Sequence, residues 1–156
     1  MKRNVLLFGV IAVFFAAIGI YFGNKHHSPA APESPAVATF FAQQMEDSAG
    51  KMQTLGEWQG KTLIVNFWAT WCAPCVEEMP ELTELQTELA GKNIQILGVG
   101  IDSPSNIREF AAKYKITYPL YIAGLTGSEL SRQFGNQAGG LPFTVIIGPQ
   151  GDVRKT

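Results

Sequence analysis

Three short apolar runs constrain the fold of this chain most strongly. They are "TLIVNFW" at residues 62–68, "IQILGVGI" at residues 94–101 and "FTVII" at residues 143–147. Each run is almost continuously apolar and rich in β-branched residues, which is typical of a strand buried on both faces. Strands of this kind are common in mainly parallel sheets that are covered by helices. The sequence therefore predicts an α/β sandwich around a mixed, mainly parallel central sheet.

Helical patterns lie between these runs. Ser103 and Pro104 form a typical helix start, with a capping hydroxyl followed by proline in the first turn. Apolar residues then follow at helical spacing: Ile107, Phe110, Ala111 and Tyr114. Residues 126–129, "TGSE", have the pattern of a capping box at the start of a second helix, which we expect to stop at Gly135.

The two ends of this region read as hairpins. Upstream, "TFFAQQ" and "GKMQTL", which begin at Thr39 and Gly50, predict an initial pair of strands. At the other end, "GPQGDVRKT" predicts a turn that leads into a last strand, after which the sequence stops. Because an α/β sheet normally carries a further helix there, we expect residues 39–156 to be a domain that is truncated at its C-terminus.

The N-terminus predicts a membrane anchor. Residues 5–23 contain no charged side chain, and as a helix they would span about 28 Å, close to the thickness of a bilayer core. Lys2 and Arg3 precede this run, which places the N-terminus in the cytoplasm and the rest of the chain outside. We expect an uncleaved anchor at residues 1–23. A cleaved signal peptide remains an alternative, although its apolar region is usually only about 7–15 residues long.

Residues 24–38 contain three prolines and few large apolar side chains, so we interpret them as a flexible tether. They also hold the chain's two histidines, His26 and His27. No cysteine or carboxylate lies near them at metal-ligand spacing, and we predict no metal site. The formal net charge is −1, from 12 basic and 13 acidic residues, and this balance argues against a nucleic-acid-binding surface.

The chain has only two cysteines, Cys72 and Cys75, which form a C-x-x-C motif. One local pair is too little for a disulfide-stapled scaffold, and a structural zinc site would need four ligands. The motif follows the run at residues 62–68, and we expect a helix to begin near Ala73. Cys72 would then lie at the positive N-terminal end of that helix, where a thiolate is favoured. We predict that Cys72 is the exposed attacking thiol and that Cys75, which is more buried, resolves the mixed disulfide.

The helix that follows has one apolar face with an acidic residue on it. The apolar residues lie within about one third of its circumference: Cys75, Met79, Leu82, Leu85 and Leu89. Glu78 falls in the same arc, so we expect desolvation to raise its pKa and allow it to exchange a proton with Cys75. The alternative is that Glu78 reaches the edge of this face or pairs with a basic side chain. Pro80 is expected to kink the helix without ending it.

A second proline motif comes directly before the run at residues 143–147. Leu141–Pro142 is a plausible cis peptide bond, and the backbone before such a proline can pair with an extended substrate strand. We assign Trp71, Pro74, Leu141 and Pro142 to the expected client-binding site.

The segment "VNFWATWCAPC", residues 65–75, followed by "LPFTVI", residues 141–146, resembles the thioredoxin superfamily, and its details resemble the membrane-anchored TlpA-like and ResA-like branch. The resemblance covers residues 39–156 and implies a thioredoxin-like three-layer sandwich. It implies that Cys72 is the nucleophile, Cys75 the resolving thiol, Pro142 the cis-proline and Glu78 the active-site glutamate.

Two departures from the family pattern bear on the chemistry. Asn66 occupies the position of the buried aspartate of cytosolic thioredoxins, and Ala73–Pro74 replaces the Pro-His pair of strongly oxidising relatives. Without that histidine the thiolate is stabilised less, which makes the dithiol the better reductant.

The resemblance implies a monomeric thiol-disulfide oxidoreductase on the bacterial inner membrane, with its domain in the periplasm or on the outer face. Its clients would be proteins with cysteine pairs, such as apo-cytochromes c or metal-delivery proteins. A membrane electron donor of the CcdA or DsbD type would re-reduce it, and no cofactor is implied. Two alternatives remain open: a disulfide oxidase or isomerase, and a metal-binding chaperone that uses the same cysteines.

Overall fold

The computed structural model describes residues 34–156. The expected anchor at residues 1–23 and most of the expected tether lie outside this range. The elements follow in the order α2 (Pro35–Phe41), β1 (Gln44–Asp47), β2 (Met52–Thr54), η1 (Leu55–Trp58), β3 (Thr62–Trp68), α3 (Ala73–Glu88), β4 (Ile94–Gly100), α4 (Pro104–Tyr114), β5 (Leu120–Ile122), α5 (Leu125–Gln133), β6 (Phe143–Ile147) and β7 (Val153–Lys155). From residue 34 onward, none of the helices has the length and hydrophobicity needed to cross a membrane.

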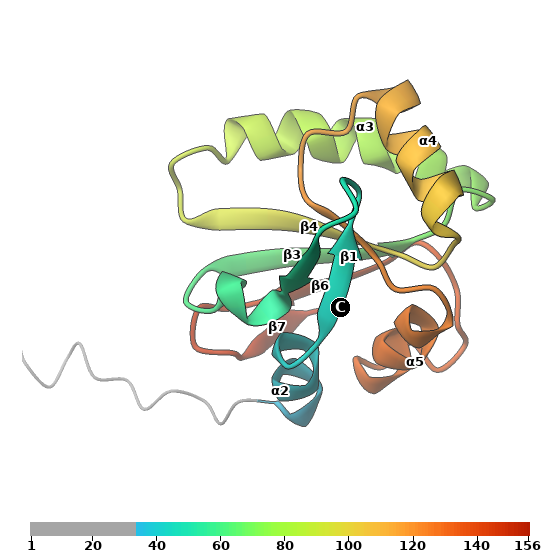
Figure 1. Ribbon diagram of the computed structural model, residues 1–156. Coiled ribbons are helices and arrows are strands. Elements are labelled where there is room, and N and C mark those ends of the chain that lie inside the picture. Colours follow the sequence, from blue (N-terminus) through green and yellow to red (C-terminus); the bar gives the residue numbers. More distant parts are fainter. Residues whose placement is uncertain (1–33) are drawn as a thin grey trace, which may run out of the picture. The chain divides into compact units, whose positions relative to one another are not determined.

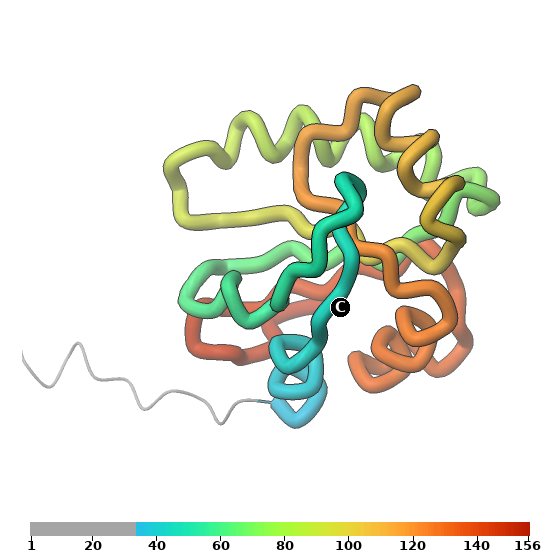
Figure 2. The backbone as a smooth tube through the Cα atoms, viewed as in Figure 1, coloured from blue at the N-terminus to red at the C-terminus, as the bar shows by residue number. Residues whose placement is uncertain are grey.

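The strands form one sheet in the order β2-β1-β5-β4-β3-β6-β7. Only β3–β4 and β4–β5 are parallel pairs, and Figure 2 shows the crossover from β4 through α4 to β5. The other four pairs are antiparallel. The predicted mixed sheet is confirmed, but the expectation that it is mainly parallel is wrong. A nearly continuous apolar run does not reveal strand direction: β6 is such a run and is buried at Val145 and Ile147, yet it runs antiparallel to β3.

Helices cover both faces of the sheet (Figure 1), which confirms the predicted three-layer sandwich. The core on one side joins α2 and α5 to the sheet and includes Phe40, Phe67 and Phe134. The core on the other side joins α3 and α4 to the sheet, and it includes Trp68, whose ring lies 4.8 Å from that of Phe110. Both cysteines belong to this second core, so the redox pair is built on a packed part of the domain.

The folded domain begins earlier than the expected boundary at Thr39. Helix α2 starts at Pro35, so residues 35–38 are not tether, and the segment beginning at Thr39 is not the first strand. Val37, Phe40 and Phe41 are buried on one side of α2 because they follow at i, i+3 and i+4. The predicted hairpin exists, but its first strand starts at Gln44.

The two predicted helix starts have different outcomes. Ser103 caps α4 as predicted, because its Oγ accepts a hydrogen bond from the backbone N–H of Asn106 at 3.3 Å. The capping box at residues 126–129 is wrong, since α5 already begins at Leu125 and has no side-chain cap. Only two residues separate the end of β5 from α5, and the sharp turn falls on the second of them, Gly124, whose φ of 53° favours glycine. The predicted last strand is confirmed as β7, which pairs with β6.

Replacing Phe40 with alanine should lower the free energy of unfolding by about 3–5 kcal/mol, because Phe40 is fully buried between α2 and the sheet. Denaturant unfolding of the variant measures the change. Gln44→Ala, at an exposed position on β1, is the control and should stay close to the unmodified protein. A change as small as that of the control would show that α2 contributes little to the core.

Candidate active site

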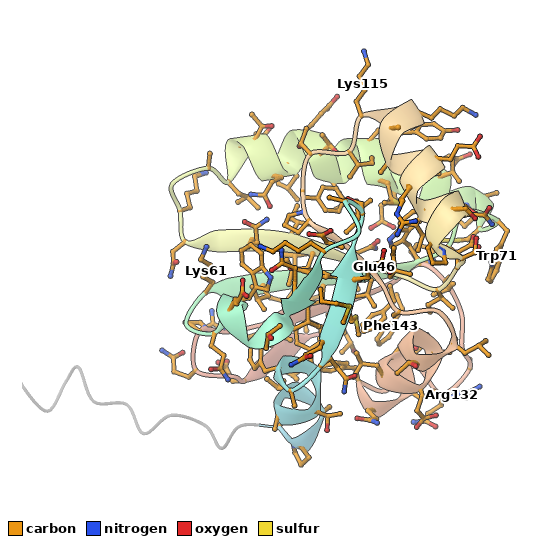
Figure 3. All side chains as sticks on the ribbon, viewed as in Figure 1. Glu46, Lys61, Trp71, Lys115, Arg132 and Phe143 are labelled. Carbon is orange, nitrogen blue, oxygen red and sulfur yellow. A yellow bond between two sulfur atoms is a disulfide. The ribbon has the colours of Figure 1, made fainter. Side chains whose placement is uncertain are left out.

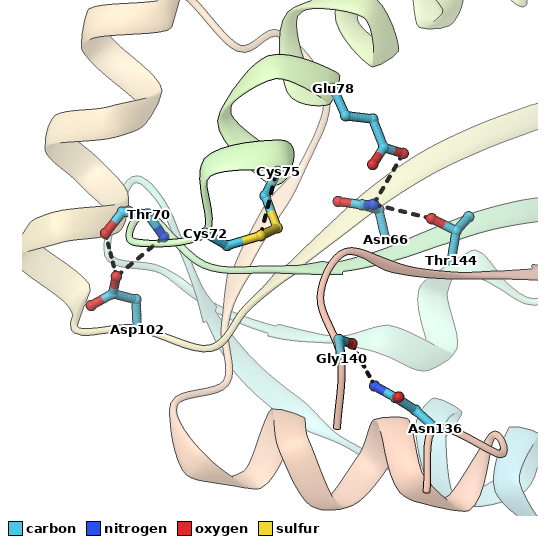
Figure 4. The surroundings of a disulfide bond; sticks show 9 residues. All are labelled: Asn66, Thr70, Cys72, Cys75, Glu78, Asp102, Asn136, Gly140 and Thr144. Carbon is cyan, nitrogen blue, oxygen red and sulfur yellow. Dashed lines mark hydrogen bonds between the residues drawn. A yellow bond between two sulfur atoms is a disulfide. The ribbon is translucent and has the colours of Figure 1, made fainter. Parts of the chain in front are cut away.

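Cys72 and Cys75 form a disulfide at the start of α3 (Figure 4). β3 ends at Trp68, and a four-residue turn, residues 69–72, leads to Ala73, where α3 begins as predicted; we call this segment the redox turn. Cys72 is the N-cap residue, and its Sγ accepts a hydrogen bond from the backbone N–H of Cys75 at 3.3 Å. The sulfur therefore lies where the unpaired backbone N–H groups and the helix dipole favour negative charge.

The two sulfurs differ in exposure, but less than expected. Cys72 is 6% exposed and Cys75 is 1% exposed, so Cys72 is the more accessible of the pair. The expectation that Cys72 is an exposed residue is wrong for the disulfide form, because the bond holds both side chains against the core that contains Trp68. The exposed surface beside them comes from Pro74 and from Trp71, which is 69% exposed and lies at the edge of the domain (Figure 3).

The face of α3 that carries Cys75 also carries Glu78, as predicted. Burial raises the pKa of Glu78, and the negative charge of Glu81 raises it further, which confirms the predicted direction. Glu78 forms no ion pair with any of the residues that the structure describes. Its Oε1 instead accepts a hydrogen bond from Asn66 Nδ2 at 3.5 Å. Proton exchange between Glu78 and Cys75 stays a prediction. Pro80 lies inside α3 without ending it.

Asn66 links Glu78 to the sheet. It is buried on β3, and its Nδ2 also donates to Thr144 Oγ1 on the neighbouring strand β6, at 3.1 Å. An amide cannot take up a proton, so Asn66 orients the carboxylate and leaves the proton chemistry to Glu78. No local sequence pattern points to Thr144, because its contact with Asn66 depends on the register between β3 and β6.

Tyr118 is a further buried polar group on this side of the sheet. Its hydroxyl has no hydrogen-bond partner within residues 34–156. Burial and the negative charge of Glu78 raise its pKa, so the hydroxyl keeps its proton. Tyr118 precedes β5, a strand too short to stand out in the sequence, and for this reason sequence reasoning missed it.

The Leu141–Pro142 peptide bond is cis, as predicted. It leads directly into β6, whose first residue, Phe143, is paired with Phe67 of β3. Leu141 is half-buried and packs against both cores, one of which contains the two cysteines. The structure thus brings Leu141 and Pro142 to the end of β3 from which the redox turn leaves. Their contact with a client stays a prediction, as does that of Trp71 and Pro74.

Thr70 connects the redox turn to α4 through Asp102, a contact that the sequence analysis missed. The backbone N–H of Thr70 donates to Asp102 Oδ2 at 3.3 Å, and its hydroxyl donates to the same oxygen. Burial alone would raise the pKa of Asp102, but hydrogen bonds from Thr70, Ser103 and Asn106 outweigh it and hold the pKa below its usual value. The available signal was an aspartate directly after an expected strand.

A family model described as "AhpC/TSA family" matches residues 36–156. The chain belongs to the AhpC/TSA family. Two similar proteins are both named thiol-disulfide oxidoreductase ResA. The one from Geobacillus thermodenitrificans is 30% identical over 99% of this chain and 86% of its own length, and the one from Bacillus cereus is 31% identical over 98% and 87%.

A similar solved structure is a thiol:disulfide interchange protein of the thioredoxin family from Chlorobium tepidum. It aligns with a TM-score of 0.64 and 26% identity over 72% of this chain and 79% of its own. The resemblance to thioredoxin-fold oxidoreductases is confirmed. The two segments on which the resemblance was based, residues 65–75 and 141–146, lie next to each other because β3 and β6 are paired.

Proposed function

We propose that this protein, a thiol-disulfide oxidoreductase, reduces the disulfides of client proteins outside the cytoplasm. The observation that carries the proposed direction is the environment of Cys72. Its sulfur accepts a hydrogen bond from a backbone N–H at the start of α3, and no side chain of residues 34–156 donates a hydrogen bond to either sulfur. A modestly stabilised thiolate favours the disulfide form, so the dithiol gives up its electrons readily.

The exchange proceeds in two displacements. In the reduced protein the Cys72 thiolate attacks one sulfur of the client disulfide, which forms a mixed disulfide and releases the other client sulfur as a thiolate. Cys75 then loses its proton and attacks Cys72 Sγ. This forms the Cys72–Cys75 disulfide and releases the second client thiolate. Two electrons pass from the protein to the client.

Glu78 is the proposed acceptor of the Cys75 proton. It lies three residues after Cys75 on α3, and its raised pKa makes its carboxylate a better base than that of an exposed glutamate. The hydrogen bond from Asn66 holds the carboxylate on the side of the sheet that packs against α3. In relatives with a buried aspartate at the Asn66 position, the base stands on the strand, whereas here we place it on the helix.

The client would bind beside the cis-proline. β6 is paired with β3 through Phe143, so the backbone at Leu141 lies where the strand ladder stops and is suited to pair with an extended client segment. Trp71, which lies within the redox turn, offers a large exposed apolar surface for the same segment.

The proposed location follows from the apolar run at residues 5–23, which anchors the chain in the bacterial inner membrane and leaves the domain in the periplasm or on the outer face. Cysteine pairs of apo-cytochromes c or of metal-delivery proteins are the proposed clients. A membrane donor of the CcdA or DsbD type would return the electrons.

The reduction potential of the Cys72–Cys75 couple tests the proposed direction. We expect a value below about −200 mV, between those of protein disulfide isomerase and thioredoxin. Equilibration of the protein with glutathione or dithiothreitol buffers, followed by thiol trapping, measures it. A value near that of DsbA, about −120 mV, would make the protein an oxidant and overturn the proposal while leaving the exchange chemistry intact.

A further inference from the structure

We propose that Asp102 is a positioning residue for the nucleophile Cys72, and that it acts through Thr70. This inference rests on the proposed role of Cys72 in thiol-disulfide exchange. It adds a residue from the end of β4, 30 positions away in the sequence, to a site otherwise built on the redox turn, α3 and the cis-proline.

Thr70 lies inside the turn that places Cys72. The turn is closed by a hydrogen bond from the backbone N–H of Cys72 to the carbonyl of Ala69, at 3.2 Å. Both donors of Thr70, its N–H and its hydroxyl, point at one oxygen of Asp102 (Figure 4). A residue held by both its backbone and its side chain has little freedom, so the direction in which the chain enters Cys72 is fixed.

Asp102 is itself held firmly. Its other oxygen accepts hydrogen bonds from the backbone N–H of Ser103 at 2.6 Å and from Asn106 Nδ2 at 2.8 Å, both at the start of α4. Directly before it, the N–H of Ile101 donates to the carbonyl of Trp68 at 2.8 Å and joins the ends of β3 and β4. Four donors thus converge on one carboxylate, which ties the redox turn to α4 and the sheet.

The position of Cys72 matters because its sulfur reacts as a thiolate. The hydrogen bond from the N–H of Cys75 and the field of α3 act on this sulfur only while Cys72 stays in the N-cap geometry. When the turn is free to move, the reduced sulfur spends less time at that position and its thiolate is populated less. The alternative is that Asp102 serves only to start α4.

The test is the rate at which iodoacetamide alkylates Cys72 at neutral pH, measured in a Cys75→Ala background so that only one thiol reports. Thr70→Val keeps the shape of the side chain but loses its hydroxyl, and Thr70→Ser restores the hydroxyl. We expect Thr70→Val and Asp102→Ala to slow alkylation by about tenfold, a typical part of the activation that a helix N-terminus gives a thiol. Thr70→Ser should restore the rate to within about twofold of the background protein, since it keeps both donors.

Ser103→Ala is the matched control, because it removes the side-chain cap of α4 but keeps the backbone donor to Asp102. It should destabilise the start of α4 and leave the alkylation rate unchanged. The double variant Thr70→Val with Asp102→Ala should be no slower than Asp102→Ala alone, because Asp102→Ala already removes the hydroxyl contact that Thr70→Val removes.

The inference is overturned if Thr70→Val alkylates as fast as the background protein, if Ser103→Ala slows alkylation equally, or if the effects of the two single variants multiply. If Asp102→Ala does not fold, the alkylation rates of Thr70→Val, Thr70→Ser and Ser103→Ala still test the inference. If Cys72 of the otherwise unmodified protein reacts no faster than free cysteine, the proposed function itself fails, and this outcome is distinct from the others.

Discussion

Cys72→Ser should abolish the reduction of a client disulfide, whereas Cys75→Ser should leave the first step and block the second. Serine at position 72 provides no thiolate at the start of α3, so the activity should fall to the uncatalysed background. Serine at position 75 leaves the nucleophile in place but nothing to resolve the mixed disulfide, so the protein should accumulate as a covalent complex. Insulin reduction measures the first outcome, and non-reducing electrophoresis with mass spectrometry measures the second.

The two variants control each other, since each keeps one sulfur in nearly the same environment. Cys75 is almost inaccessible at 1% exposure, so Cys72→Ser should form no mixed disulfide. If Cys72→Ser formed the covalent complex and Cys75→Ser did not, the assigned order of the two thiols would be reversed. If both variants kept full activity, the reaction would not use this pair at all.

Glu78→Gln should slow the resolving step by about a hundredfold, the usual contribution of a positioned general base. Glutamine fits the same site and can still accept the hydrogen bond from Asn66, but it cannot take the proton of Cys75. The ionised form of Glu78 is the active base, and burial raises its pKa above the usual 4.5. The rate for the unmodified protein should therefore fall as the pH drops through that raised value, and this acid limb should be missing in the variant. Stopped-flow measurement of mixed-disulfide decay over a pH series records both effects.

Glu77→Gln is the control for this experiment, because Glu77 is exposed on the opposite side of α3 and has the same charge. It should leave both the rate and the pH profile unchanged. Stability gives an independent check. A carboxyl whose pKa is raised on folding destabilises the fold at a pH above that value, so Glu78→Gln should be somewhat more stable than the unmodified protein at neutral pH. An acid limb that persists in Glu78→Gln would assign the proton transfer to another group.

The three central strands and the start of α3 could be predicted because their signals are local. β3, β4 and β6 appear in the sequence as nearly continuous apolar runs, the C-x-x-C motif directly follows the first of them, and Ser103 marks the start of α4. Strand direction could not be obtained in this way, since a buried strand has the same composition whether its neighbour runs parallel or antiparallel. β5 is only three residues long, too short for a period to show.

The same distinction applies to the site. The cysteines, Glu78 and Pro142 each belong to a compact motif, so their places were predicted from neighbouring residues. Thr144 and Asp102 were not predicted, because each reaches the site through a pairing between segments far apart in the sequence. No local pattern carries the register of β6 against β3, or the distance from the end of β4 to the redox turn.

The near-complete enclosure of the Cys72–Cys75 bond has a consequence for the cell. A disulfide whose sulfurs have only a few per cent of their surface open to solvent is a poor target for the small thiols that diffuse past it. In this oxidised form the bond would then be reduced fastest by a protein that fits closely around the redox turn. The enclosure thus selects the electron donor by shape, since it slows unspecific reduction by small thiols.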